Sequence, residues 1–212
     1  MQIQKIPNQI IRGSLTPLSI SNIDGIAFHH MANKTWDVKD VERYHVHTNG
    51  WIAIGYNFWI GFDGTVYEGR GFNLGAGISG HNSHVISIGL QGDFMTQIPT
   101  KEQYKACAEL VEYLKEKLPN IKHIGKHSDY SATACPGVNF DIGKILNYNK
   151  ESNKVEEKIY NWTTACPEWS QPYVHKALEL GWVKGNEKGE LNLTDIKIWV
   201  IVVLLRALGF ME

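Results

Sequence analysis

A polar stretch, NYNKESNKVEEK, divides the 212-residue chain into a longer N-terminal part and a shorter C-terminal part. Within it, the apolar or aromatic side chains are Tyr148 and Val155. A segment of this kind cannot bury a face and is typical of a linker. We therefore expect a first domain over residues 1–146, a linker over 147–158 and a small module over 159–212.

The composition excludes several classes of protein. The chain is 43% hydrophobic and 20% charged, which is enough apolar material for a folded core. Its net charge of -1 provides no field that would attract nucleic acid or an anionic membrane. The longest strongly apolar run, 198–205, is far below the roughly 18 residues of a membrane span, and the first residues do not resemble an export signal. We expect a cytoplasmic location in the producing cell, with no nucleic-acid or membrane partner.

The first domain is predicted to mix strands with helices. Runs rich in β-branched and aromatic residues, bounded by Gly, Asp or Asn, predict strands at 25–28, 54–60 and 85–88. The Asp63-Gly64 pair predicts a tight hairpin that brings Trp59 opposite Val66 and Tyr67. The pattern favours an α/β fold with a central mixed β-sheet flanked by helices.

Capping residues and apolar spacing mark the predicted helices. Thr100 and Gln103 form a capping box before apolar positions that recur at helical spacing until Pro119, and Cys107 is expected to be a buried member of that stripe. A second helix is expected over 37–47. In the tail, Ser170 is predicted to cap one helix that ends at Gly181, and another is expected from Thr194 to Gly209.

The small C-terminal domain is thus expected to be mainly helical. Two helices of this length barely enclose a core. We expect the module to rest on the first domain, to self-associate, or to build a compact unit from its aromatic residues. These are Trp162, Trp169, Tyr173, Trp182 and Trp199.

Histidines and a cysteine in the first domain suggest a metal site. His29 and His30 directly follow a predicted strand, and His127 stands eight residues before Cys135. A helix of eight residues would rise about 12 Å, whereas two ligands of one zinc ion lie within roughly 4 Å of each other. The segment 127–135 must therefore be a loop if both residues bind one ion. One thiolate and two imidazoles would leave zinc an open position, which is typical of catalytic sites.

Three motifs in this order resemble a known enzyme family. They are FHH at 28–30, IGYNFWIGFDGTVYEGR at 54–70 and HSDYSATACPG at 127–137. Together they resemble zinc-dependent N-acetylmuramoyl-L-alanine amidases of the phage-lysozyme and peptidoglycan-recognition-protein type, over about residues 20–146. The resemblance implies a sheet flanked by helices with Zn²⁺ in an open groove. It also implies hydrolysis of the amide bond between the lactyl group of N-acetylmuramic acid and L-alanine in peptidoglycan.

The same resemblance assigns roles to five residues. It makes His29, His127 and Cys135 the zinc ligands, Tyr56 the tyrosine beside the reacting water, and Thr133 the residue that supports the oxyanion. The chemistry agrees with these residue types, because zinc activates water and polarises the carbonyl. Hydroxyl donors such as Tyr56 and Thr133 stabilise the developing oxyanion.

The sequence departs from the family pattern at two places. Some relatives carry a glutamate base where the segment VISIGLQGDF has Gly89 or Gln91. Tyr56 or the zinc-activated water must therefore take a larger part in the catalysis here. Many relatives carry a histidine at the position of Gly77.

The predicted substrate contacts are therefore His30 and Asn82, with His81 as an alternative to Asn82. Strand alternation directs His30 away from His29, so it either contacts the groove or makes a structural hydrogen bond. Asp129 is expected to stabilise its loop. The remaining histidines, His45, His47, His84, His123 and His175, are expected to be surface or packing residues.

The C-terminal sequence CPEWSQPYVHKALELGWVKG resembles small helical modules, similar to surface-layer homology units, of clostridial-type cell-wall hydrolases. That resemblance implies attachment to the bacterial cell wall or homo-oligomerisation; the alternative is an appendage that only stabilises the enzyme. The whole chain then resembles a phage or prophage endolysin that lyses Gram-positive cells and is released to the wall at lysis. A cytosolic recycling amidase would share the absence of an export signal.

Two other functions compete with the amidase. One is a peptidoglycan-binding protein that does not cleave, although Tyr56 and Cys135 are both present. The other is a Cys/His hydrolase with Cys135 as nucleophile and His127 as base. A cysteine in a Pro-Gly loop lacks the helix N-terminus that would lower its pKa, which disfavours this reading.

Overall fold

The computed structural model describes residues 1–148 and 160–211. The chain divides into two compact units, Met1–Glu151 and Ser152–Glu212, and each has a hydrophobic core of its own. The predicted linker lies almost entirely outside the described residues, so its boundaries stay a prediction. No helix among the described residues is long and apolar enough to cross a membrane.

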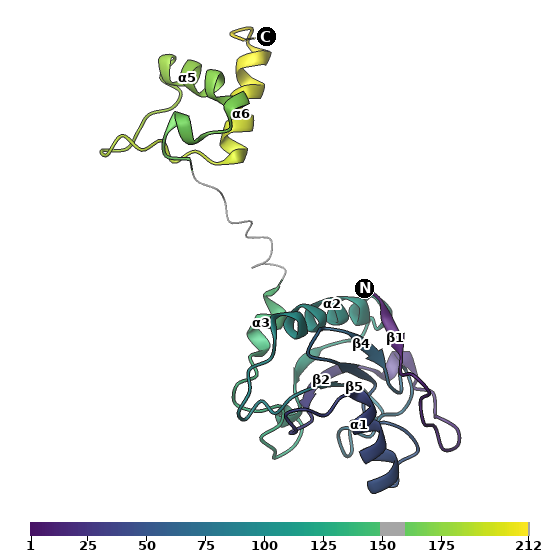
Figure 1. The fold of residues 1–212 in the computed structure, drawn as a ribbon. Coiled ribbons are helices and arrows are strands. Elements are labelled where there is room, and N and C mark those ends of the chain that lie inside the picture. The colour runs from purple at the N-terminus through teal and green to yellow at the C-terminus, as the bar shows by residue number, and fades with distance from the viewer. Residues whose placement is uncertain (149–159, 212) are drawn as a thin grey trace. The chain divides into compact units, whose positions relative to one another are not determined.

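The N-terminal unit is built on a mixed six-stranded sheet with the order β1-β4-β3-β5-β2-β6 (Figure 1). Strands β3 and β4 are antiparallel, and the other neighbouring strands are parallel. The strands are β1 (Ile3–Lys5), β2 (Gly25–His30), β3 (Phe58–Ile60), β4 (Val66–Glu68), β5 (Val85–Leu90) and β6 (His123–Lys126). The predicted fold class is confirmed.

Helices cover both faces of this sheet (Figure 1). Helices α2 (Lys101–Lys117) and α3 (Ile142–Leu146) lie on one side, and α1 (Val38–Arg43) lies on the other. Helix α1 continues into one π-helical turn, η2 (Tyr44–Thr48), and short 3-10 turns occur at η1 (Ile20–Asn22) and η3 (His127–Asp129). The predicted helix over 37–47 is therefore present, but its second half is π-helical.

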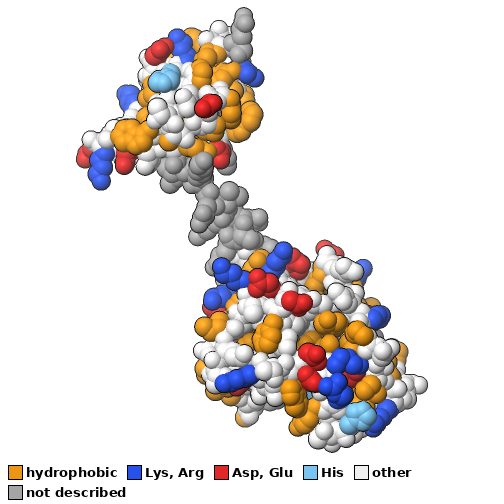
Figure 2. All heavy atoms as spheres, in the orientation of Figure 1, with side chains coloured by type: hydrophobic (Ala, Val, Ile, Leu, Met, Phe, Trp, Pro, Cys, Tyr) orange, Lys and Arg blue, Asp and Glu red, His pale blue; other side chains and the backbone are white. Residues whose placement is uncertain are grey.

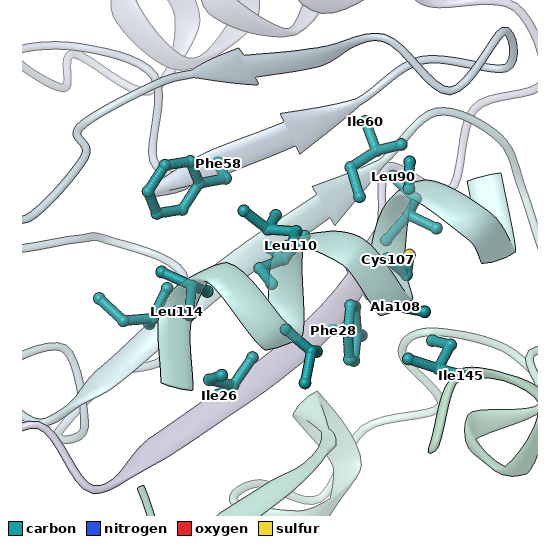
Figure 3. Packing of buried hydrophobic residues seen from close by; sticks show 14 of the residues in the cluster. Ile26, Phe28, Phe58, Ile60, Leu90, Cys107, Ala108, Leu110, Leu114 and Ile145 are labelled. Carbon is teal, nitrogen blue, oxygen red and sulfur yellow. The ribbon is translucent and has the colours of Figure 1, made fainter. Parts of the chain in front are cut away.

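Alternation along β2 separates the core from the site. Ile26 and Phe28 belong to the core that also contains Leu110 and Leu114 of α2 (Figure 3). Because successive strand residues point to opposite faces, His29 projects from the other side of the sheet. Cys107 is fully buried in the α2 core, as expected, and burial raises the pKa of its thiol.

Two predictions of local structure are confirmed and one needs correction. The Thr100 hydroxyl accepts a hydrogen bond from the Gln103 backbone N–H at 3.0 Å, so the capping box is present. Trp59 pairs with Tyr67 in the antiparallel hairpin. The predicted strand over 54–60 is too long, since β3 begins at Phe58.

The reason is that the carbonyl groups of Tyr56 and Asn57 bond to the loop that follows β4 and not to a neighbouring strand. The backbone N–H of Arg70 donates to the Tyr56 carbonyl at 3.0 Å, and the N–H of Gly69 donates to the Asn57 carbonyl at 2.9 Å. Tyr56 therefore lies in a loop at the start of the strand, held by the glycine-rich segment that follows β4.

The C-terminal unit is small, mainly helical and compact. Its elements are η4 (Thr163–Ala165), η5 (Glu168–Ser170), α5 (Gln171–Glu179) and α6 (Asp195–Ala207). Helices α5 and α6 pack around a core that includes Tyr160, Tyr173 and Leu205. The four tryptophans, Trp162, Trp169, Trp182 and Trp199, are exposed, so the core does not depend on burying them.

The two helices of this unit differ in how they begin. The Thr194 hydroxyl accepts a hydrogen bond from the Lys197 N–H at the start of α6. Ser170 occupies the cap position of α5, but its hydroxyl donates to the Pro167 carbonyl at 2.7 Å and does not cap the helix. The Ser170 prediction was wrong because Ser170 has helical backbone angles (φ -95°, ψ -16°) instead of the extended ones of a cap, and Pro172 has no N–H to donate to it.

Candidate metal centre

Two parallel neighbouring strands place two histidines at the same level of the sheet. In the register of β2 and β6, Phe28 pairs with Lys126, and the next residues are His29 and His127. Their ring centroids lie 4.5 Å apart. Strand pairing therefore brings together residues that are far apart in sequence.

A loop returns Cys135 to the same place. The backbone N–H of Ser128 donates to the Cys135 carbonyl at 3.0 Å, which closes the loop that the sequence analysis predicted. Gly137 has a φ of +107°, and a Cβ there would lie 2.4 Å from the Phe94 carbonyl carbon, so only glycine fits. The Cys135 Sγ lies 3.8 Å from His29 Nδ1.

These three residues fit a zinc ion. One ligand atom from each of His29, His127 and Cys135 lies within 4.8 Å of the others. Two imidazoles and one thiol form a donor set typical of catalytic zinc, which keeps a further position open. Burial lowers the pKa of both histidines, and His127 and His30 lower that of His29 further. Both rings are therefore neutral near pH 7, as ligation requires.

Tyr56 and Thr133 line the same pocket, whose volume is about 320 Å³. The Tyr56 ring centroid lies 5.3 Å from that of His29. Burial, and then the neighbouring Cys135, raise the pKa of the Tyr56 phenol, so it stays protonated and can donate a hydrogen bond. The Thr133 hydroxyl accepts a hydrogen bond from the Cys135 N–H at 3.2 Å, and its own hydrogen can serve another acceptor.

The two predicted substrate contacts have structural partners. His30 Nδ1 accepts a hydrogen bond from the Phe94 backbone N–H at 3.0 Å, although part of the residue lines the pocket. Asn82 Oδ1 accepts from the Ile78 N–H at 2.9 Å, and Asn82 is not among the described residues that line the pocket. Contact of either residue with substrate stays a prediction.

The strand beside β2 offers no carboxylate to the site. Gly89 pairs with His29, and a Cβ at Gly89 would lie 2.5 Å from Tyr56 Cδ2. Gln91 Oε1 instead accepts a hydrogen bond from the Phe62 N–H at 3.0 Å, away from the pocket residues. The Tyr56 ring therefore occupies the space that a side chain at position 89 would need.

Asp129 stabilises its loop, as expected. Its carboxylate accepts hydrogen bonds from the Lys126 backbone N–H at 2.9 Å and from His123 Nε2 at 3.0 Å. These bonds lie at the end of β6, just before His127. Asp129 thus helps to hold the turn that presents the second histidine.

His45 is a pocket residue that the sequence analysis assigned to the surface or to packing. It is buried, lines the pocket and packs edge-on against Tyr56, with ring centroids 5.4 Å apart. The signal was its spacing, because Val38, Val41 and His45 follow the i, i+3, i+7 pattern of one buried helix face.

The buried His45 gives an expected pH dependence of stability. Its Nδ1 accepts a hydrogen bond from the Gly55 N–H, and burial together with the Arg70 guanidinium lowers its pKa to about 4. A histidine with a lowered pKa stabilises the fold above about pH 6.5 and loses this contribution as the pH falls towards 4.

We expect His45→Gln, which keeps an acceptor but does not titrate, to reduce the loss of unfolding free energy between pH 7 and pH 4. The loss of unfolding free energy in the variant should be smaller than the loss in wild type by about 3 kcal/mol. Urea unfolding at both pH values measures it. Equal pH dependence in the two proteins would show that His45 titrates normally.

Comparison with known proteins agrees with this geometry. Residues 19–138 match the family model described as N-acetylmuramoyl-L-alanine amidase. The amidase LysC from Clostridium intestinale URNW has a similar structure, with a TM-score of 0.61, 29% identity, and coverage of 71% of this chain and 98% of that chain. The endolysin amidase LysCS from the same organism gives a TM-score of 0.61 and 30% identity, covering 70% of this chain and 95% of that one.

Animal proteins are also similar. Peptidoglycan-recognition protein SC2 of Drosophila melanogaster is 33% identical over 140 residues, which cover 60% of this chain and 76% of that protein. SC2 of Drosophila simulans is 37% identical over 105 residues, which cover 48% of this chain and 57% of that protein. The family model matches more than half of the sequence, and the matched residues include the three motifs, the His-His-Cys cluster and the strands that position its histidines. The chain therefore belongs to the N-acetylmuramoyl-L-alanine amidase family.

Proposed function

We propose that this chain is a zinc-dependent amidase that cleaves the bond between N-acetylmuramic acid and L-alanine in peptidoglycan. The observation that carries the proposal is the convergence of His29, His127 and Cys135 at the edge of an open pocket. When bound there, zinc supplies Lewis-acid polarisation of the scissile carbonyl and lowers the pKa of water.

The protein's own residues hold the reacting groups. The three ligands fix the position at which the carbonyl binds. Tyr56, whose phenol stays protonated, donates a hydrogen bond to the carbonyl oxygen as negative charge develops on it. Thr133 lies on the cysteine loop, is exposed, and offers a second hydroxyl to the pocket.

We expect Tyr56→Phe to slow turnover by about 10²- to 10³-fold, the usual cost of losing one oxyanion donor. Zinc content should stay at the wild-type level, because Tyr56 is not a ligand. Steady-state kinetics on a muramyl peptide and elemental analysis of the same sample measure both quantities. Loss of zinc in this variant would contradict the division of roles between Tyr56 and the ligands.

Mass analysis of products from purified cell wall tests the bond that is cleaved. The proposal requires free stem peptides that begin with L-alanine and glycan strands that keep intact lactyl groups. Release of disaccharides or of shortened stem peptides would instead identify a glycosidase or a peptidase. Binding without any product would support the non-catalytic alternative.

The Cys/His hydrolase alternative has less support from the site. Burial raises the pKa of the Cys135 thiol to about 11, whereas a cysteine nucleophile needs a lowered pKa. Chelation separates the two mechanisms. We expect a zinc chelator to inactivate the enzyme and added Zn²⁺ to restore it; activity of the metal-free protein that a thiol alkylator abolishes would favour the nucleophile.

We further propose that the C-terminal unit attaches the enzyme to the bacterial cell wall. A groove of about 820 Å³ in this unit combines Trp182 and Leu204 with polar side chains such as Asn186, Glu190 and Lys197. This combination suits a wall polymer with apolar and polar faces. Figure 2 shows hydrophobic side chains spread over the surface of this unit.

Self-association through the C-terminal unit stays a prediction. The surface on which to test it is the side of α6 where Trp199, Val200 and Val203 are all more than half exposed. Exposed apolar patches of this kind commonly mark interaction sites.

We propose that the biological role is that of a phage or prophage endolysin acting on Gram-positive, clostridial-type cells. The similarity to an endolysin amidase from Clostridium intestinale and to the Ph2119 endolysin of a Thermus scotoductus bacteriophage supports this role. The enzyme would wait in the cytoplasm and reach the wall at lysis. Purified protein should then lower the turbidity of clostridial cell suspensions, whereas a recycling amidase would hydrolyse soluble muropeptides and leave intact walls unchanged.

A further inference from the structure

Two buried polar atoms beside the metal centre have no hydrogen-bond partner among the described residues. They are Nε2 of His29 and Oγ of Ser87. Both residues are 1% exposed. Because a buried polar group without a partner costs free energy, each of these atoms calls for a physical explanation.

The two side chains lie on the same face of the sheet. In the register of β2 and β5, Ala27 pairs with Ser87 and His29 pairs with Gly89. Since every second residue of a strand shares a face, Ser87 stands diagonally next to His29. Diagonal neighbours on adjacent strands are within reach of a histidine side chain.

Gly77 shows that their side chains approach the same space. A Cβ at this position would lie 2.5 Å from Ser87 Oγ and 3.4 Å from His29 Cε1, the carbon between the two ring nitrogens. A side chain at position 77 would displace the serine hydroxyl. This explains in physical terms why glycine stands where the family pattern has a histidine.

The orientation of His29 determines which nitrogen carries the proton. Its Nδ1 lies 3.8 Å from Cys135 Sγ and therefore faces the ligand cluster. When Nδ1 holds a metal, the hydrogen of the neutral ring is on Nε2, which then needs an acceptor. Ligating histidines almost always donate this second N–H to a group that fixes the ring.

We infer that Ser87 is a positioning residue whose hydroxyl accepts the Nε2 hydrogen of His29 when zinc is bound. Asn57 holds the backbone of Ser87 in place. The Asn57 side-chain Oδ1 accepts a hydrogen bond from the Ser87 backbone N–H, and the Asn57 backbone N–H donates to the Ser87 carbonyl, both at 2.9 Å. The inference rests on the zinc site of the proposed function.

Zinc affinity of the full chain tests the inference without any activity measurement. We expect Ser87→Ala to weaken zinc binding about 10- to 100-fold in competition with a chromophoric chelator. The matched control is Val85→Ala, which removes a buried side chain two residues earlier on the same strand face. The control should bind zinc with wild-type affinity, so a loss confined to Ser87→Ala reports the hydroxyl and not general destabilisation.

A second measurement uses the wild-type protein. In the zinc-loaded chain, long-range ¹H–¹⁵N spectra should show a slowly exchanging proton on Nε2 of His29. That proton should exchange rapidly in Ser87→Ala. A proton on Nδ1, rapid exchange in wild type, or unchanged affinity in Ser87→Ala would overturn the inference. Failure of the wild-type chain to bind zinc at all would instead refute the proposed function on which it rests.

Discussion

Replacing Cys135 with serine is expected to abolish turnover and to remove most of the bound zinc. The Cys135 Sγ lies 3.8 Å from His29 Nδ1 and is one of the three atoms that converge on the site. A thiolate is a strong zinc ligand, whereas a serine hydroxyl stays neutral and binds weakly, so two histidines remain. Elemental analysis and hydrolysis of a muramyl peptide on the same preparation measure both effects.

The chain contains a matched control for this experiment. Cys166 is also a free cysteine, but it is buried in the C-terminal unit, where its Sγ donates to the Trp162 carbonyl. We expect Cys166→Ser to retain zinc and turnover. Wild-type zinc content in Cys135→Ser would contradict the assignment of this residue as a ligand.

Deleting residues 150–212 is expected to separate catalysis from attachment to the wall. The two units have cores that share no residue, so the N-terminal unit should fold and keep its metal site without the C-terminal one. Hydrolysis of a soluble muramyl peptide should stay at the wild-type rate. Binding to purified cell wall should fall by about 10²-fold or more, because a linked second binding site adds avidity of this size.

Sedimentation of the protein with purified cell wall, compared with the rate on soluble substrate, measures the two properties separately. A truncated chain that no longer hydrolyses soluble muramyl peptide would refute the division of labour between the units. Undiminished wall binding would assign attachment to the N-terminal unit.

The four inner strands and the main helix followed from the sequence because their signals are local, whereas the edge strands β1 and β6 were not predicted. The capping box at Thr100 and the Asp63-Gly64 turn each specify a structure within a few residues, and both appear as expected. The strand over 54–60 was predicted too long for the opposite reason. Its aromatic residues favour a strand, but Tyr56 and Asn57 bond to a segment beyond β4, which local propensity cannot reveal.

The candidate site depended on a different kind of information. The spacing from His127 to Cys135 predicted a loop, which the structure shows, but the convergence of His29 with His127 depends on the parallel register of β2 and β6. That register is a long-range property that the sequence does not reveal, and the expectation that the two histidines bind one ion came from the family resemblance. The prediction of His45 as a surface or packing residue did not place it in the pocket, because helical spacing indicates a buried face but not what that face borders.

Ser87 and Gly77 illustrate what neither motif nor spacing can provide. Serine in a strand has no distinctive pattern, and its relation to His29 becomes visible only when two strands are paired and the unpartnered atoms are known. Gly77 departs from the family pattern. In the structure it is the position at which a side chain would collide with Ser87.

Anomalous diffraction from crystals of the full chain at the zinc absorption edge tests the central claim most directly. The account predicts one strong peak for each chain, within bonding distance of His29 Nδ1, His127 and Cys135 Sγ, with a side of the ion open to the pocket that Tyr56 lines. A map in which these three side chains surround no anomalous scatterer, in crystals grown with zinc, would contradict it.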